Sequence, residues 1–71
     1  MHIQDINNRF TYHAPKPGQS KRYEDLREAG RQLAILINDL CPESREKSLA
    51  ITKVEEAISW ANAAIARNEY E

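Results

Sequence analysis

The chain has 71 residues, 30% of them charged, and a formal net charge of −1. This length permits one domain at most, and the near-neutral charge argues against a protein that coats DNA or RNA polymers. A single cysteine excludes an intrachain disulfide, and the histidines and the cysteine lack the spacing of a zinc site. Because a lone core of this size supplies only about 3–5 kcal/mol, we expect oligomerisation to stabilise the chain.

Hydropathy along the chain gives no membrane signal. No run approaches the roughly 18 apolar residues that a membrane-spanning helix needs. The first ten residues, MHIQDINNRF, contain no hydrophobic signal core. An unpaired cysteine also fits a reducing compartment, so we expect a soluble, intracellular protein.

Residues 1–19 predict an arm followed by a loop. A short helix is expected around residues 3–10, although the Asn7-Asn8 pair is poor helix material. Pro15, Pro17 and Gly18 then exclude regular structure. Residues 13–19 are therefore expected to form a loop or an ordered extended stretch.

Residues 20–40 predict the first long helix, with Ser20 as its N-cap. Its expected apolar face alternates spacings of three and four and comprises Tyr23, Leu26, Gly30, Leu33, Ile37 and Leu40. A glycine within a helix costs about 1 kcal/mol relative to alanine. We therefore expect another backbone to approach closely at Gly30.

Residues 44–68 predict the second long helix. Pro42 ends the preceding helix and is acceptable in the first turn of the next. The apolar stripe of this second helix comprises Ile51, Val54, Ile58, Ala61 and Ile65. Leu49 and Trp60 lie off the stripe, so the apolar arc is wider than the roughly 100° of an ordinary surface helix. Residues 1–71 are thus expected to form one all-α domain, a hairpin that assembles into a compact homo-oligomer.

Catalytic motifs are not apparent in the sequence. It contains no glycine-rich phosphate loop, no metal motif and no specific nucleophile–base pattern. Glu55 and Glu56 are adjacent, so their carboxylates point in different directions on a helix. Cys41 is expected to be a small buried residue rather than a nucleophile. These features favour a binding protein without cofactor or metal over an enzyme.

One candidate binding group lies along the first long helix. Tyr23, Arg27 and Arg31 are spaced i, i+4, i+8 and share one edge of that helix. Guanidinium groups beside an aromatic ring suit a ligand with phosphates and flat bases. Alternatively, Arg27 and Arg31 pair with Glu24 and Glu28 or contact another subunit, and the spacing leaves both interpretations open.

A second candidate group lies on the arm. The run RFTYH at residues 9–13 interleaves aromatic and cationic side chains and could cover a pocket, with Lys21 nearby in sequence. Alternatively, Phe10 and Tyr12 pack the arm onto the hairpin. Trp60 is expected to anchor an interface rather than to contact a ligand.

The run SREKSLAITKVEEAISWANAAIARN at residues 44–68, together with RFTYH and Tyr23-x-x-x-Arg27, resembles the small phage anti-CBASS sponge proteins. Their helical-hairpin domain is shared with sponges of other phage counter-defence systems. The resemblance covers nearly the whole chain. It implies a homohexamer, located in the cytoplasm of the infected bacterium, that sequesters cyclic oligonucleotide messengers without cleaving them. CBASS effectors would then remain inactive.

The resemblance also implies roles for individual residues. Tyr12 would stack on a base and Arg27 would contact a phosphate. The weaker candidates that it implies are Arg9, Lys21, Arg31 and Arg67. Cyclic dinucleotides such as cyclic GMP–AMP would bind between subunits, and some members also hold cyclic trinucleotides at separate sites. Two alternatives stay open, which are a sponge for a cyclic ADP-ribose type signal and a helical protein–protein adaptor with no small ligand.

Overall fold

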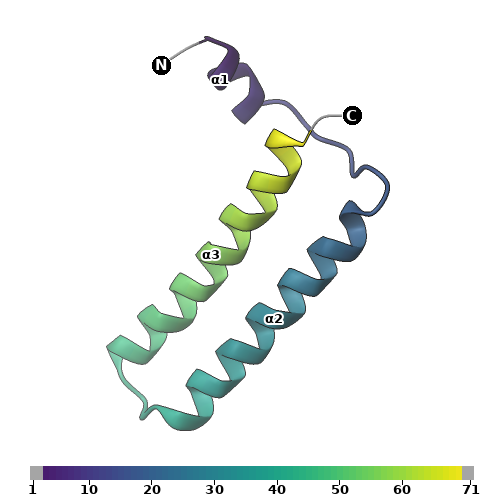
Figure 1. Ribbon diagram of the computed structural model, residues 1–71. Coiled ribbons are helices and arrows are strands. Elements are labelled where there is room, and N and C mark those ends of the chain that lie inside the picture. Colours follow the sequence, from purple (N-terminus) through teal and green to yellow (C-terminus); the bar gives the residue numbers. More distant parts are fainter. Residues whose placement is uncertain (1–2, 70–71) are drawn as a thin grey trace.

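The computed structural model describes residues 3–69, which form three α-helices and no strand. These are α1 (Ile3–Arg9), α2 (Gln19–Leu40) and α3 (Arg45–Asn68). α2 and α3 run antiparallel as a hairpin, and α1 lies at its open end, beside the end of α3 (Figure 1). The predicted all-α hairpin with a short N-terminal helix is confirmed. No helix in this described part is long and apolar enough to cross a membrane.

The start of α2 differs from the prediction. Gly18 precedes the helix with a φ of 85°, in the left-handed region that favours glycine, and no side chain caps the helix there. Ser20 lies inside α2, so its predicted role as N-cap was wrong. Instead, the turn closes on Gln19, whose Oε1 accepts a hydrogen bond from the Lys16 backbone N–H at 2.8 Å.

The link between the two long helices, residues 41–44, contains Pro42, which lies outside α3. Ser44 caps α3, because its Oγ accepts a hydrogen bond from the Lys47 backbone N–H at 3.1 Å. Cys41 is exposed, so the expectation that it is buried was wrong. The link leaves this side chain outside the contact between the helices.

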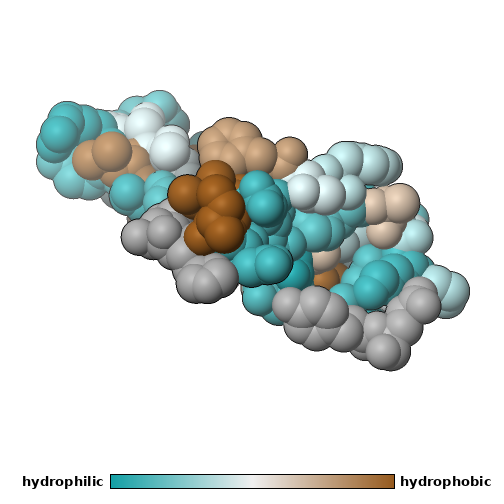
Figure 2. Space-filling model, turned by 90° about the horizontal axis from the view of Figure 1, so that it is seen from above, coloured by the Kyte–Doolittle hydropathy of each residue, from teal (hydrophilic) through white to brown (hydrophobic). Residues whose placement is uncertain are grey.

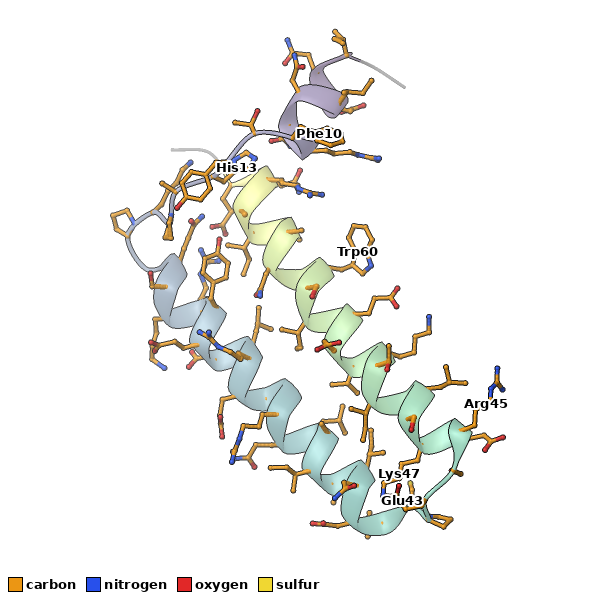
Figure 3. The ribbon with its side chains drawn as sticks, turned by 180° about the vertical axis from the view of Figure 1, so that it is seen from behind. Phe10, His13, Glu43, Arg45, Lys47 and Trp60 are labelled. Atoms are coloured by element: carbon orange, nitrogen blue, oxygen red, sulfur yellow. The ribbon has the colours of Figure 1, made fainter. Side chains whose placement is uncertain are left out.

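Lys47 is an unusually buried cation in the first turn of α3, with a side chain only 7% exposed. Its Nζ contacts Glu43 Oε1 at 2.6 Å, and the two side chains meet at the hairpin turn (Figure 3). Pairing offsets the cost of removing the ammonium group from water.

The contact between α2 and α3 is made by the predicted stripe of α3, whose members are all half-buried: Ile51, Val54, Ile58, Ala61 and Ile65. On α2, however, Leu33 and Leu40 are exposed, and Ala34 is half-buried in their place. At 3.6 residues per turn, Ala34 lies nearer the centre of the inward face than either leucine does. The prediction for these two leucines was wrong.

Gly30 is buried on the face of α2 that contacts Ile58 of α3. A Cβ built there would lie 2.6 Å from Ile58 Cγ1 and 3.0 Å from Ile58 Cδ1. The close neighbour is therefore a side chain, not the backbone that the sequence led us to expect. Glycine at this position gives room to Ile58.

Much apolar surface stays exposed. No apolar side chain of residues 3–69 is fully buried, and the large exposed ones are Ile3, Ile6, Phe10, Tyr12, Leu33, Ile35, Leu36, Leu40, Leu49 and Trp60. Seen toward the open end, apolar side chains lie on the surface among hydrophilic ones (Figure 2). Trp60 is 64% exposed and points from α3 away from α2 (Figure 3). Phe10 is 87% exposed, so the alternative that it packs the arm onto the hairpin does not hold within one chain.

Candidate functional site

A groove of about 580 Å³ opens where the arm meets the ends of α2 and α3. Its lining residues are Arg9, Thr11, Tyr12 and His13 from the arm, Tyr23 and Arg27 from α2, and Ile58, Asn62, Ala63, Ala66 and Arg67 from α3. The volume falls within the roughly 300–1,000 Å³ typical of small-molecule sites. We refer to this feature as the arm groove.

The arm groove carries positive charge without a counter-charge. Among the described residues, the guanidinium groups of Arg9, Arg27 and Arg67 form no ion pair, and no carboxylate lines the groove. Elsewhere, each of the following cations is paired with a carboxylate: Lys21, Arg22, Arg31, Lys47 and Lys53. Guanidinium groups bind phosphate bidentately, so the groove suits an anionic ligand with phosphate groups.

Aromatic rings complete the walls of the arm groove. Tyr12 is 84% exposed, which leaves its ring free to stack on a flat ligand. Tyr23 is half-buried between the helices and contributes a fixed wall. The His13 Nε2 lies 3.0 Å from the Asn8 carbonyl oxygen, so this ring is held by the arm itself.

Asn62 is a lining residue that the sequence reasoning missed. Its Oδ1 is buried and has no hydrogen-bond partner among residues 3–69. A polar residue one turn after Ile58, beside the apolar stripe of α3, was the available signal. Whether Asn62 lines a groove depends on where the arm lies, and residue spacing within α3 does not reveal that position.

The structure separates the six candidate residues into two groups. Arg9, Tyr12, Arg27 and Arg67 meet around the arm groove. Lys21 does not line it and pairs with Asp25. Arg31 lines a smaller adjoining groove of about 280 Å³, which shares Arg27 with the arm groove.

The alternative that α2 arginines pair within their own helix holds for one of the two. Arg31 Nη1 contacts Glu28 Oε1 at 3.2 Å. Arg27 forms no such pair with Glu24 or any other described carboxylate. Arg27 is therefore the α2 cation that remains available to a ligand.

The end of α3 closes the hairpin through Glu69. Its Oε2 accepts a hydrogen bond from Arg22 Nη1 at 2.7 Å, and its Oε1 accepts one from Gln19 Nε2 at 2.8 Å. These two hydrogen bonds, the one from Arg22 first, lower the pKa of the Glu69 carboxyl to about 2. The carboxylate thus joins the end of α3 to the start of α2.

A two-helix hairpin whose arm lines a groove with unpaired guanidinium groups has the form of a small binding domain. The chain belongs to the family described as Acb2/Tad1, hairpin domain, whose model matches residues 1–66. The resemblance to the anti-CBASS sponges is confirmed, and membership implies a sponge-type function in general. No curated protein and no solved structure matches the chain.

Proposed function

We propose that the chain sequesters cyclic oligonucleotide messengers in the cytoplasm of an infected bacterium and so prevents activation of CBASS effectors. The proposed ligands are cyclic dinucleotides such as cyclic GMP–AMP, which are held intact and not cleaved. One observation carries this proposal: three unpaired guanidinium groups surround a groove that an exposed tyrosine also lines. Family membership supports the class of ligand.

Each part of a cyclic dinucleotide has a complementary group in the arm groove. Arg27 is assigned to one phosphate and Arg9 or Arg67 to the other, since guanidinium groups form charge-assisted hydrogen bonds with phosphate oxygens. Tyr12 is assigned to a base, a contact worth about 1–3 kcal/mol per stacked base. Lys21 and Arg31 are assigned no direct contact with a dinucleotide, because both are paired outside this groove.

Assembly into a homohexamer forms part of the proposal, with subunits covering the exposed apolar surface. Trp60 is the clearest test, because truncating a large aromatic side chain that is buried in an interface costs about 3–5 kcal/mol. In a single chain Trp60 is largely exposed, so Trp60→Ala should leave the hairpin folded. Sedimentation should show a smaller species, and an unchanged profile would remove Trp60 from the interface.

Isothermal calorimetry with purified protein and cyclic GMP–AMP tests ligand binding directly. Heat denaturation of the saturated complex, followed by chromatography, should return the intact dinucleotide, which separates sequestration from cleavage. No heat with any cyclic di- or trinucleotide at micromolar concentration would refute the proposal. Heat from a cyclic trinucleotide after saturation with the dinucleotide would indicate a separate site.

Two outcomes would favour the alternatives instead. Displacement of cyclic GMP–AMP by a cyclic ADP-ribose type compound at lower concentration would favour a sponge for that signal. The exposed apolar surface is the reason to consider a protein–protein adaptor. That alternative is favoured if Tyr12→Ala and Arg27→Ala leave phage protection unchanged while Trp60→Ala abolishes it. Phage survival in a CBASS-bearing host measures this comparison.

A further inference from the structure

The arm supplies much of the arm groove but contains no helix of its own there. α1 ends at Arg9, and α2 begins only at Gln19. Thr11, Tyr12 and His13 therefore line the groove from irregular backbone. Such a segment keeps its place only where contacts outside it hold both of its ends.

The first end is held by the last turn of α3. Asn8 Nδ2 donates a hydrogen bond to the Arg67 carbonyl oxygen at 3.0 Å. That carbonyl belongs to the final turn of the helix, where backbone acceptors lack partners within the helix. α1 is thereby tied to α3, and Arg9 is brought to the groove.

The second end is held by Glu69. Lys16 Nζ donates a hydrogen bond to the Glu69 carbonyl oxygen at 2.7 Å. The Glu69 carboxylate in turn accepts hydrogen bonds from Gln19 and Arg22 at the start of α2. Gln19 is only 3% exposed, so this set of contacts is partly shielded from water.

An isolated surface ion pair contributes little stability. Glu69 instead takes part in several hydrogen bonds at once. Arg22 contacts both carboxylate oxygens of Glu69. Glu69 also accepts a hydrogen bond from Gln19 through its carboxylate and one from Lys16 through its backbone carbonyl oxygen. Bidentate geometry fixes direction as well as distance. Glu69 thus joins three elements: the arm, α2 and α3.

We propose that Glu69 is a positioning residue, which holds residues 9–16 over the arm groove and prepares the groove for its ligand. The ligand part of this inference rests on the proposed function, and the positioning part does not. Glu69 lies beyond residues 1–66, the part that the family model matches, so the role is assigned from this chain's own contacts. A binding segment that is ordered before binding loses less freedom on binding, which strengthens affinity.

Hydrogen–deuterium exchange of the free protein tests positioning without any ligand. Glu69→Ala keeps the carbonyl that binds Lys16 but removes the carboxylate that holds Gln19, whose Oε1 accepts a hydrogen bond from the Lys16 N–H. It should therefore speed exchange of the amides in residues 10–16 while the middle of α2 and α3 keeps its protection. Glu56→Ala is the matched control, because it removes a carboxylate of the same charge but breaks only an exposed pair with Lys53. Unchanged exchange in the arm of Glu69→Ala would overturn the proposal.

Titration with cyclic GMP–AMP tests the consequence for binding. Glu69→Ala should weaken binding about tenfold, since ordering of the arm must then accompany association. Glu69→Gln keeps one acceptor oxygen and should fall between wild type and Glu69→Ala, whereas Glu56→Ala should match wild type. Thermal unfolding of each variant checks that the hairpin persists.

A double-mutant cycle with Tyr12→Ala separates positioning from general stability. If Glu69 acts by holding Tyr12 in place, Glu69→Ala should weaken binding less than about twofold in the Tyr12→Ala background. An equal tenfold loss in both backgrounds would overturn the positioning role. If wild type binds no cyclic dinucleotide, the proposed function fails, and the exchange experiment alone decides the role of Glu69.

Discussion

The two ends of the hairpin differ in where their unpaired cations lie. At the turn end, Lys47 is nearly buried and paired with Glu43, and Ser44 caps the helix beside them. At the open end, Arg22 pairs with Glu69, while Arg27 and Arg67 both line the arm groove without a carboxylate partner among the described residues. Paired charges thus occur at both ends, and what distinguishes the open end is that its unpaired guanidinium groups line one groove.

This difference follows from how each end is closed. Residues 41–44 join the helices covalently at the turn end, where Lys47 pairs with Glu43 of this link. The open end has no such link and is closed through Glu69 and the arm. Several unpaired cations that line one groove mark a candidate site more clearly than total charge does.

The largest expected effect is a loss of ligand affinity when a cation is removed at the open end. Arg27→Ala removes the proposed charge-assisted hydrogen bond to phosphate and should weaken binding of cyclic GMP–AMP by about 1.5–3 kcal/mol. Because Arg27 is exposed, the thermal midpoint should change little. Calorimetry and thermal unfolding measure the two quantities.

Arg45→Ala is the control for that change. Arg45 lies at the turn end, points away from the hairpin (Figure 3) and forms no ion pair among residues 3–69. Arg45→Ala removes the same charge at the opposite end of the hairpin and should leave the affinity for cyclic GMP–AMP unchanged. A comparable loss of affinity would mean that overall charge, not the arm groove, attracts the ligand.

The contact between α2 and α3 should be sensitive to one methyl group added at residue 30. Gly30→Ala places a Cβ against Ile58, and overpacking of this kind costs about 1–3 kcal/mol. The higher helix propensity of alanine offsets about 1 kcal/mol of this cost, so the net loss in free energy of unfolding should be about 0–2 kcal/mol. Urea unfolding measures it.

The Ile58→Ala background sharpens this prediction, because it removes the atoms that a Cβ would meet. There, Gly30→Ala should stabilise the chain by up to about 1 kcal/mol through helix propensity alone. The change of sign is the diagnostic result. If Gly30→Ala destabilises both backgrounds equally, Ile58 is not what restricts residue 30.

Local signals in the sequence were enough to predict the fold. The spacing from Ile51 to Ile65 and the break at Pro42 depend only on neighbours in sequence, and both long helices appeared within one residue of the predicted bounds. The errors at Ser20 and Cys41 concern caps and links. Their outcome depends on contacts that arrive from elsewhere, such as those made by Gln19.

The sequence indicated most of the residues that line the site but not which of its charged groups are paired. Arg27 and Arg31 each follow a glutamate by three residues, yet only Arg31 is paired with it. The two arginines differ in their surroundings, since both line a groove with α3 but only Arg27 also lines the groove that includes arm residues. The buried Oδ1 of Asn62 has the same origin, since tertiary contacts decide whether its partners are present.

The turn end should show a smaller and purely structural effect. Ser44→Ala removes the side-chain acceptor for the Lys47 N–H and should cost about 1 kcal/mol of unfolding free energy. Affinity for cyclic GMP–AMP should be unaffected, since the arm groove lies at the other end. Ser48→Ala, an exposed change one turn later, is the control and should not destabilise the chain. Weaker binding by Ser44→Ala would mean that the two ends are coupled.

The smallest expected effect is the response of the open end to acid. The pKa of Glu69 falls from 4.5 to about 2 because Arg22 and then Gln19 donate hydrogen bonds to the charged carboxylate. A carboxyl with a lowered pKa in the folded state stabilises that state fully above its unfolded pKa. This contribution should therefore be constant above pH 4.5 and should decline as the pH falls toward 2. Unfolding free energies of wild type and Glu69→Gln, measured across this range, should converge in acid. Glu43 at the turn end also has a lowered pKa, through its hydrogen bond with Lys47, but it is common to both proteins and cancels. A difference that stays constant down to pH 2 would show that the charge of Glu69 does not close the open end.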